Sequence, residues 1–280
     1  MPLKVPSALC CMNETVKYRR GGMFLERENR REREWNENQL EGRNAVLEVL
    51  RSGRDIEKIM VQKGNVEGTI KRIVAQAAEK GVVIQEVSRQ KLDELSQTKN
   101  HQGVIALVSA HDYVEVEDIL AAARAKGEDP FIILLDGITD PHNLGAILRT
   151  AECAGAHGVI IPKRRSVGLN ATVGKTSAGA IEYMPVAKVT NLVKTMEQLK
   201  KEGLWFACAD MGENDHFDTN LKGPIGLVIG SEGEGVSRLV KEKCDFTVAI
   251  PMYGRGSSLN ASVAAALLMY EVVRQRNYSK

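Results

Sequence analysis

The stretch FIILLDGITDPHNLGAILRTAECAG, residues 131–155, decides the fold, because an apolar run passes directly into glycine, polar residues and a helical pattern. An uninterrupted apolar run is typical of a parallel strand that is covered on both faces. Asp140 is predicted to cap a helix that starts at Pro141, where a missing N–H is tolerated. Apolar residues at spacing i, i+3, i+4 and i+7 then predict the buried stripe of this helix: Leu144, Ile147, Leu148 and Ala151.

Two further apolar runs end in the same way. The segment VIGSEGEGVS, residues 228–237, passes from a strand pattern into a glycine-rich loop. The segment IPMYGRGSSLNASVAAALL, residues 250–268, passes through a loop into a long helical pattern. Open α/β sheets present their ligand-binding groups at the ends of strands. We therefore expect the function to lie at these three joints.

Composition gives the frame for this reading. The chain of 280 residues is long enough for two domains, and 43% hydrophobic with 26% charged residues is a globular balance. No stretch approaches the roughly 20 apolar residues that cross a bilayer, and the N-terminus lacks a secretory signal, so we expect a cytoplasmic protein without a membrane segment. The five cysteines form no CxxC pair or Cys/His cluster, which predicts reduced thiols and no metal site. A net charge of +2 does not by itself indicate a nucleic-acid partner.

Changes of pattern along the chain predict four segments. Residues 1–35 interleave acidic and basic side chains and are expected to be a disordered tail. Strand and helix patterns alternate over residues 36–111, which predicts a small α/β domain. Residues 112–129 are expected to be a linker with one helical pattern. Residues 130–280 form the second α/β domain, which carries the three joints.

Each joint also has a simpler interpretation. Asn143, Ser258 and Asn260 are residue types that cap helices, and Arg149 is suited to a surface salt bridge. The loop G-S-E-G-E-G at residues 230–235 superficially resembles a dinucleotide loop. Its spacing is not G-x-G-x-x-G, however, and its two carboxylates would repel a pyrophosphate, so a nicotinamide or ATP site is disfavoured. The joint appearance of all three clusters in this order favours a functional reading.

Taken together, N-L-G-A-I-L-R-T (143–150), G-S-E-G (230–233) and S-S-L-N-A-S (257–262) resemble the three signature motifs of the SpoU/TrmH family of RNA ribose 2'-O-methyltransferases, in the SPOUT superfamily. The resemblance extends over about residues 36–276. Residues 39–108, including E-G-R-N-A-V and H-Q-G-V, are similar to the substrate-binding domain of the branch that modifies guanosine in large-subunit (23S) ribosomal RNA.

The resemblance implies a trefoil-knotted SPOUT methyltransferase domain, preceded by a smaller α/β substrate-binding domain, and a homodimer. It also implies S-adenosylmethionine as the cofactor, with Gly230, Ile250 and Leu259 at the backbone positions that contact it. Glycine at 230 is expected because a side chain would push the adenosyl group away. No metal is required, because the sulfonium is already an activated methyl donor.

The catalytic positions that the resemblance implies are Asn143, Arg149, Glu232, Ser258 and Asn260. Two roles are open for Arg149, because a guanidinium normally stays protonated. It is either the general base in a desolvated site, or a clamp on phosphate and ribose while a phosphate oxygen or water takes the proton. Glu232 is expected to orient Arg149 or the substrate, and Ser258 and Asn260 to hold the third loop and the target nucleotide.

Other functions compete with this reading. The same chemistry on transfer RNA, or on another ribosomal nucleotide as a resistance methylase, changes only the substrate. A non-catalytic RNA-binding ribosome-assembly factor would keep the fold without the reaction. Cys153 as a base-methylating nucleophile is disfavoured, because no activating group is adjacent in sequence. Residues 163–165, Lys-Arg-Arg, are a further candidate RNA contact or a solvated loop.

Overall fold

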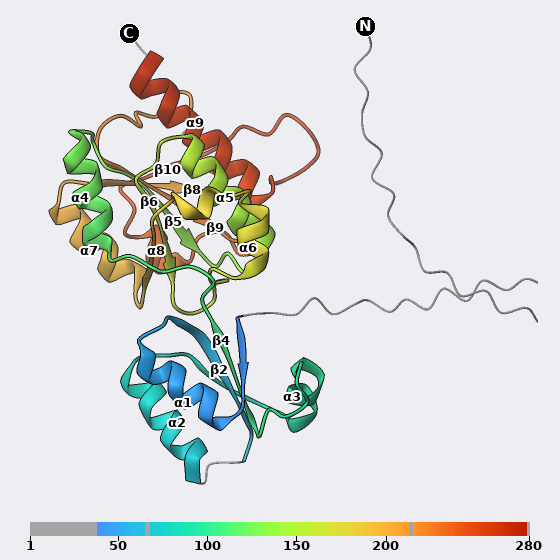
Figure 1. The fold of residues 1–280 in the computed structure, drawn as a ribbon. Helices are drawn as coiled ribbons and strands as arrows, with labels where there is room; N and C mark the ends of the chain where they lie inside the picture. Colours follow the sequence, from blue (N-terminus) through green and yellow to red (C-terminus); the bar gives the residue numbers. More distant parts are fainter. Residues whose placement is uncertain (1–37, 65–67, 213–214, 279–280) are drawn as a thin grey trace, which may run out of the picture. The chain divides into compact units, whose positions relative to one another are not determined.

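The computed structural model describes residues 38–64, 68–212 and 215–278, so the predicted tail over residues 1–35 lies outside the described residues. The described chain contains two sheets, drawn in Figure 1, one of four strands and one of six. In these three ranges, no helix has both the length and the apolar character that a membrane span requires.

The four-stranded sheet has the order β1-β4-β2-β3, with β4 antiparallel to both of its neighbours and β2 parallel to β3. Its strands are β1 (Gln39–Glu41), β2 (Ile56–Gln62), β3 (Ile84–Val87) and β4 (Val104–Val108). Helices α1 (Arg43–Ser52) and α2 (Gly68–Glu79) pack their apolar stripes on one face, and the short helix α3 (Arg89–Leu95) packs Leu92 on the other. The alternation of strand and helix expected from the sequence is therefore present.

The segment predicted as a linker contributes to the core of the second sheet. It contains α4 (Val116–Lys126), which ends at Gly127 in the left-handed conformation. Ile119 and Leu120 of α4 are buried in a cluster with apolar residues of the second sheet. A Cβ atom at Gly158, in the strand at residues 158–162, would overlap the side chain of Ile119, so the helix lies directly against that strand. The domain boundaries themselves stay a prediction.

The six-stranded sheet is parallel throughout, in the order β10-β8-β9-β5-β6-β7. Its strands are β5 (Phe131–Asp136), β6 (Gly158–Pro162), β7 (Val186–Val189), β8 (Trp205–Ala209), β9 (Ile225–Gly230) and β10 (Phe246–Val248). Along β5, Phe131, Ile133 and Leu135 belong to the core on one face, while Ile132 and Leu134 belong to the core on the other. The apolar run is thus buried on both faces, as its composition predicts.

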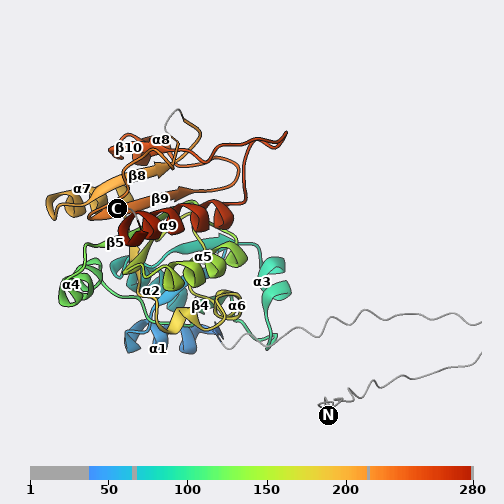
Figure 2. The same ribbon diagram turned by 90° about the horizontal axis from the view of Figure 1, so that it is seen from above.

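Helices cover both faces of this sheet. One face is covered by α5 (Pro141–Cys153), α6 (Ala171–Thr176), the turn η1 (Ala180–Glu182) and α9 (Ala261–Tyr278). The other face is covered by α4, α7 (Leu192–Lys201) and α8 (Arg238–Lys241). Figure 2 shows α5 and α9 side by side. The predicted α/β architecture is confirmed, and the trefoil knot stays a prediction.

The start of α5 forms as its sequence predicts. The Asp140 carboxylate accepts a hydrogen bond from the backbone N–H of His142 at 2.9 Å, and Pro141 occupies the first turn. The four residues of the predicted stripe are all fully buried. Gly145 lies against α6, where a Cβ atom would overlap the hydroxyl of Thr176. This close packing fixes the position of Asn143, which lies one turn after the cap.

Candidate functional site

The three joints meet at the carboxyl edge of the six-stranded sheet. Strands β5 and β9 are neighbours, and Asp136 pairs in register with Gly230 at their ends. Strand β10 lies at the sheet edge beside β8, so the third joint begins two strands away from β9. The loop after β10 returns to the middle of the sheet and delivers Asn260, directly before α9, to the other two joints.

Asn143, Glu232 and Asn260 form an acid–amide cluster, with one residue from each joint. Asn143 Nδ2 donates to Glu232 Oε1 at 2.9 Å, and Asn260 Nδ2 donates to Asn143 Oδ1 at 2.9 Å. Asn260 Nδ2 also donates to the same oxygen of Glu232. No described residue donates to Glu232 Oε2. The cluster therefore fixes one carboxylate oxygen and leaves the other available.

Asn260 both belongs to the acid–amide cluster and caps a helix. Its Oδ1 atom accepts hydrogen bonds from Ser262 N at 3.0 Å, Val263 N at 3.3 Å and Ser262 Oγ at 2.6 Å. These bonds cap the first turn of α9. Because Oδ1 binds the helix and Nδ2 binds the other two joints, the same amide positions α9 and completes the cluster.

A cavity of about 470 Å³ lies beside the cluster, at the ends of β8, β9 and β10. All three predicted cofactor positions line it: Gly230, Ile250 and Leu259. Glu232 and Ser258 line it as well, whereas Asn143, Arg149 and Asn260 do not. Its volume falls in the range of roughly 300–1,000 Å³ that is usual for small-molecule sites.

The lining of the cavity fits S-adenosylmethionine. Apolar side chains such as Ile229, Ile250 and Leu268 provide an apolar wall. The charged side chains among the lining residues are all acidic: Asp210, Glu232 and Glu234. Carboxylates attract the positive sulfonium and amino groups of this cofactor and repel a pyrophosphate. The cavity therefore matches the expected cofactor and disfavours a dinucleotide.

The structure gives a different reason for glycine at position 230 from the one expected. A Cβ atom there would overlap the backbone of Gly235 and Val236, which belong to the same loop. Ser231 and Gly235 exchange backbone hydrogen bonds at 3.0 and 3.1 Å and close this tight loop. Glycine is thus required because the loop folds back on the strand end, and the clash with the adenosyl group stays a prediction.

Arg149 lies outside the acid–amide cluster. It is exposed on α5, and no hydrogen bond or ion pair joins its side chain to any described residue. Six residues of α-helix turn by about 600°, so Arg149 projects about 120° around the helix from Asn143. The expected orientation of Arg149 by Glu232 is therefore not made within this chain. Cys153 ends the same helix, about 15 Å along its axis from Asn143, which removes it as a nucleophile for this site.

Sequence reasoning missed the contribution of β8 and of the loop that follows it. Asp210 and Met211 line the cavity, and Asp210 forms an ion pair with Lys241 of α8. Their signal was present, because the run WFACAD ends in a carboxylate as FIILLD does. His216 binds the carbonyl oxygen of Ala249 through its backbone N at 2.9 Å, and Nδ1 lies 3.2 Å from the same oxygen. This contact holds the chain directly before Ile250, and no pattern in the sequence announces it.

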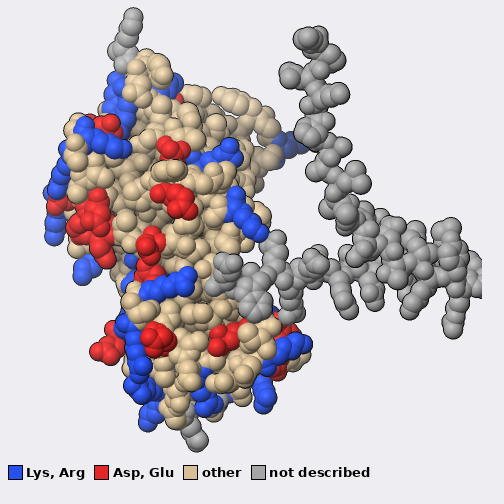
Figure 3. Space-filling view, viewed as in Figure 1, with Lys and Arg blue, Asp and Glu red and all other residues tan. Residues whose placement is uncertain are grey.

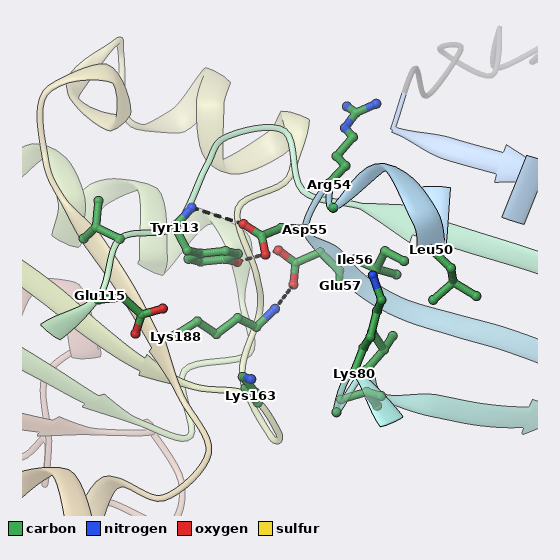
Figure 4. A pocket seen from close by; sticks show the side chains of 15 residues that line it. Leu50, Arg54, Asp55, Ile56, Glu57, Lys80, Tyr113, Glu115, Lys163 and Lys188 are labelled. Atoms are coloured by element: carbon green, nitrogen blue, oxygen red, sulfur yellow. Dashed lines mark hydrogen bonds and ion pairs between the residues drawn. The ribbon is translucent and has the colours of Figure 1, made fainter. Parts of the chain in front are cut away.

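A second cavity, of about 270 Å³, is shown in Figure 4. The Tyr113 hydroxyl and the Lys188 ammonium both bind the carboxylate of Glu57 in its wall. Burial raises the pKa of Tyr113, and the charge and hydrogen bond of Glu57 raise it further. Lys163, one of the predicted RNA contacts, also lines this cavity. Because the ammonium of Lys188 is already paired, we interpret this cavity as a structural junction.

Charge on the surface does not concentrate in a single patch on the face shown in Figure 3, where basic and acidic side chains alternate. Within the described ranges, no group of three or more His, Cys, Asp or Glu side chains is arranged to hold a metal ion.

Comparison with known proteins identifies related chains. Residues 130–270 match the model of the SpoU rRNA Methylase family, and residues 39–114 match that of an RNA 2'-O ribose methyltransferase substrate-binding domain. A Bacillus subtilis protein, whose name assigns it to the TrmH family of tRNA/rRNA methyltransferases, is 52% identical over 238 residues, which cover 84% of this chain and 95% of that protein. A Staphylococcus saprophyticus protein with the same family name is 48% identical, over 85% of this chain and 95% of its own.

A solved structure shares the fold. The SpoU methyltransferase AviRb from Streptomyces viridochromogenes, crystallised with AdoMet, superposes with a TM-score of 0.54 at 24% identity. The superposition covers 85% of this chain and 89% of AviRb. Both of the sheets described above therefore have counterparts in a known architecture.

Proposed function

The chain belongs to the SpoU rRNA methylase family, and we propose that it transfers a methyl group from S-adenosylmethionine to the 2'-hydroxyl of a guanosine in large-subunit ribosomal RNA. The family assignment makes the chain an RNA methyltransferase. The observation that carries the proposal is the acid–amide cluster, which joins all three motifs beside a cavity of suitable size and charge.

The cavity is proposed to hold the cofactor. When bound, S-adenosylmethionine supplies an activated methyl group on its sulfonium. Gly230, Ile250 and Leu259 would contact it through their backbone, and the apolar wall would exclude water from its adenosyl part. The tight loop at 230–235 and the contact from His216 to Ala249 hold the two backbone segments in place before the cofactor enters. Such preorganisation reduces the entropy that binding must overcome.

The acid–amide cluster is proposed to position the acceptor ribose. Glu232 Oε1 is fixed by two amides, so Oε2 has a defined direction in which to accept a hydrogen bond from a ribose hydroxyl. Ser258, exposed on the third loop beside the cavity, would contact the target nucleotide. Alignment of the hydroxyl with the methyl donor is the main contribution that the protein makes to such a transfer.

Arg149 is proposed to clamp a phosphate of the RNA. Its exposed guanidinium has no partner among the described residues. A bidentate bond to phosphate is the interaction that arginine makes best. In this role the proton of the ribose hydroxyl passes to a phosphate oxygen or to water.

We also propose that the protein is a homodimer. On α9, Val263, Leu267 and Tyr270 follow each other at helical spacing and are 46%, 44% and 51% exposed. Met252 and Tyr253, in the loop before the helix, are exposed as well. An apolar stripe of this kind, next to a functional loop, favours an interface with a second copy.

The N-terminal sheet supports ribosomal RNA, within the class of RNA substrates, as the proposed target. Residues 39–108 are similar to the domain of the ribosomal RNA branch, whereas the curated relatives are named for both transfer and ribosomal RNA. The filled catalytic positions oppose a purely non-catalytic assembly factor. Transfer RNA therefore stays the second candidate.

The test is methyl transfer from labelled S-adenosylmethionine to unmodified large-subunit ribosomal RNA and to transfer RNA, followed by nucleoside analysis. We expect the label in 2'-O-methylguanosine from ribosomal RNA. Label in transfer RNA alone would reject ribosomal RNA as the substrate but would still support the proposed 2'-O-methylation. Label in a methylated base, or no label despite bound cofactor, would reject the proposed reaction.

A further inference from the structure

The four-stranded sheet carries a cavity of about 550 Å³, here called the N-terminal polar pocket. It lies where the starts of α1 and α3 meet the end of β2 and the loop at residues 96–103. Three cationic side chains line it: Arg43, Arg89 and Lys99. The acidic side chain in the lining is Asp93.

The charges in this pocket do not cancel. The carboxylate of Asp93 is bound by Nε2 of the buried His101 at 2.9 Å. Arg43 donates from Nε to the neutral backbone oxygen of Gln102 at 3.2 Å, so its charge has no acidic partner. The side chains of Arg89 and Lys99 make no hydrogen bond or ion pair with any residue in the described ranges. The pocket therefore offers a net positive charge to solvent.

The loop that presents Lys99 is fixed from below by a carboxylate. Glu41 accepts hydrogen bonds from Ser96 Oγ at 2.7 Å, from Gln97 N at 2.6 Å and from Thr98. Partial burial of Glu41 opposes its ionisation, but these hydrogen bonds outweigh that effect and lower its pKa to about 2. The carboxylate is consequently ionised at neutral pH, where its hydrogen bonds hold the loop.

The same loop contains two backbone conformations that side chains rarely adopt. Lys99 and Gln102 have φ values of 59° and 52°, in the left-handed region. Such conformations persist only where the surroundings impose them, and they often accompany ligand-binding segments. The hydrogen bond from Gly103 N to Nδ1 of His101, at 3.0 Å, closes the other end of the loop. The loop backbone is thus held at both ends, while the side chain of Lys99 makes no hydrogen bond or ion pair with a described residue.

We propose that the N-terminal polar pocket binds the phosphodiester backbone of the RNA substrate. This inference rests on the proposed function and locates a binding site for its substrate away from the acid–amide cluster. Arg89 at the start of α3 and Lys99 on the loop have no described partners, so they can bind phosphate oxygens without losing an existing ion pair. No Phe, Tyr or Trp lines the pocket, and contacts to phosphate carry no sequence information. The pocket should therefore position the RNA without reading its sequence.

The test compares two charge-matched variants of the full-length protein. The first combines Arg89→Gln with Lys99→Gln. The control combines Lys71→Gln with Arg72→Gln, two exposed cations on α2 that also have no partner among the described residues. Fluorescence anisotropy would measure the affinity for a labelled fragment of the RNA that the wild type methylates, over a series of salt concentrations.

We expect the first variant to bind at least about 10-fold more weakly, and the slope of log K against log salt to fall by about 1–2, since each phosphate contact contributes about 0.7–0.9. The control should stay within about 2-fold of the wild type. The charge-retaining pair Arg89→Lys with Lys99→Arg should restore most of the affinity. The affinity of the first variant for an unrelated RNA of equal length should fall by the same factor.

Three results would overturn the proposal: an unchanged affinity and slope in the first variant, an equal loss in the control, or a loss confined to one RNA sequence. A methyl-transfer assay with the wild type separates this outcome from a failure of the proposed function. If the wild type methylates RNA and the first variant binds that RNA normally, only the pocket assignment fails. If the wild type methylates no RNA, the proposed reaction fails, whatever the pocket binds.

Discussion

The acid–amide cluster and the N-terminal polar pocket use their polar side chains in opposite ways. In the cluster, Asn143, Glu232 and Asn260 bind one another across three segments of chain, so the side chains themselves are fixed. In the pocket, the loop backbone is fixed, while Arg89 and Lys99 are left without protein partners. A reaction requires groups in one geometry, whereas a phosphate backbone requires charge that can adapt. This difference supports the two proposals, chemistry at one sheet and substrate retention at the other.

The largest expected effect tests whether Arg149 contributes to methyl transfer although it lies outside the acid–amide cluster. Arg149→Ala should reduce turnover by at least about 10²-fold, the usual loss for a positioned catalytic group, because the clamp on the RNA phosphate at the reaction site is removed. Its cofactor affinity should stay near that of the wild type, since Arg149 does not line the cavity. Steady-state kinetics and cofactor titration measure both. An equal loss of cofactor binding would show that Arg149 is structural.

The next effect tests the tight loop of the cofactor cavity. Gly230→Ala should destabilise the fold by about 1–3 kcal/mol, because the added methyl overlaps the backbone of Gly235 and something must shift. Gly254→Ala is the matched control, since a Cβ atom there meets nothing within 4 Å. Urea unfolding measures both variants. Equal stability of the two would contradict the close approach at position 230.

A smaller effect tests the coupling within the acid–amide cluster. Asn143→Ala should cost about 1 kcal/mol of unfolding free energy, because Glu232 and Asn260 are exposed and can bind water instead. In a double-mutant cycle, Asn143→Ala and Asn260→Ala should be non-additive, since each removes the same hydrogen bond. Strict additivity would mean that the cluster does not hold together in solution.

The smallest effect concerns the pH dependence of the stability that Glu41 provides to the loop at residues 96–103. Because the folded-state pKa of Glu41 is lowered from 4.5 to about 2, its ionised form stabilises the fold above pH 4.5, and this contribution is lost as the pH falls towards 2. Glu41→Gln should therefore be less stable than the wild type at neutral pH. The difference should shrink between pH 4.5 and 2. Glutamine keeps one acceptor oxygen, so the change is modest.

Unfolding of Glu41→Gln and wild type across this range checks the sign. A difference that grows on acidification would contradict the account of the loop. The side chains of Arg89 and Lys99 line the pocket and make no contact with the Glu41 carboxylate, so their neutral variants should not alter this pH profile.

The sequence predicted those features that depend on local pattern. The buried stripe of α5 and its Asp140 cap follow from the spacing of apolar residues and from the capping preference of aspartate. The three joints were also located correctly, because each is a strand end followed by loop residues. Their meeting at one edge follows from the parallel order of the strands.

Contacts between residues far apart in the sequence were harder to predict from it. The reason for Gly230 could not be read from the sequence, because it depends on how closely Gly235 returns. The contact of His216 with Ala249 joins segments 33 residues apart without any repeating pattern. The N-terminal polar pocket was missed for a similar reason, since its cations come from α1, α3 and a loop. The helix in residues 112–129 was predicted, but its packing on the second sheet was not.

Hydrogen exchange measured by mass spectrometry, with S-adenosylmethionine and RNA added separately, tests the central claim that the two ligands engage two regions. The account predicts that the cofactor protects residues 228–237 and 248–261 and leaves residues 96–103 unchanged, whereas RNA protects residues 96–103. Protection of the N-terminal loop by the cofactor alone, or RNA binding without any protection there, would contradict it.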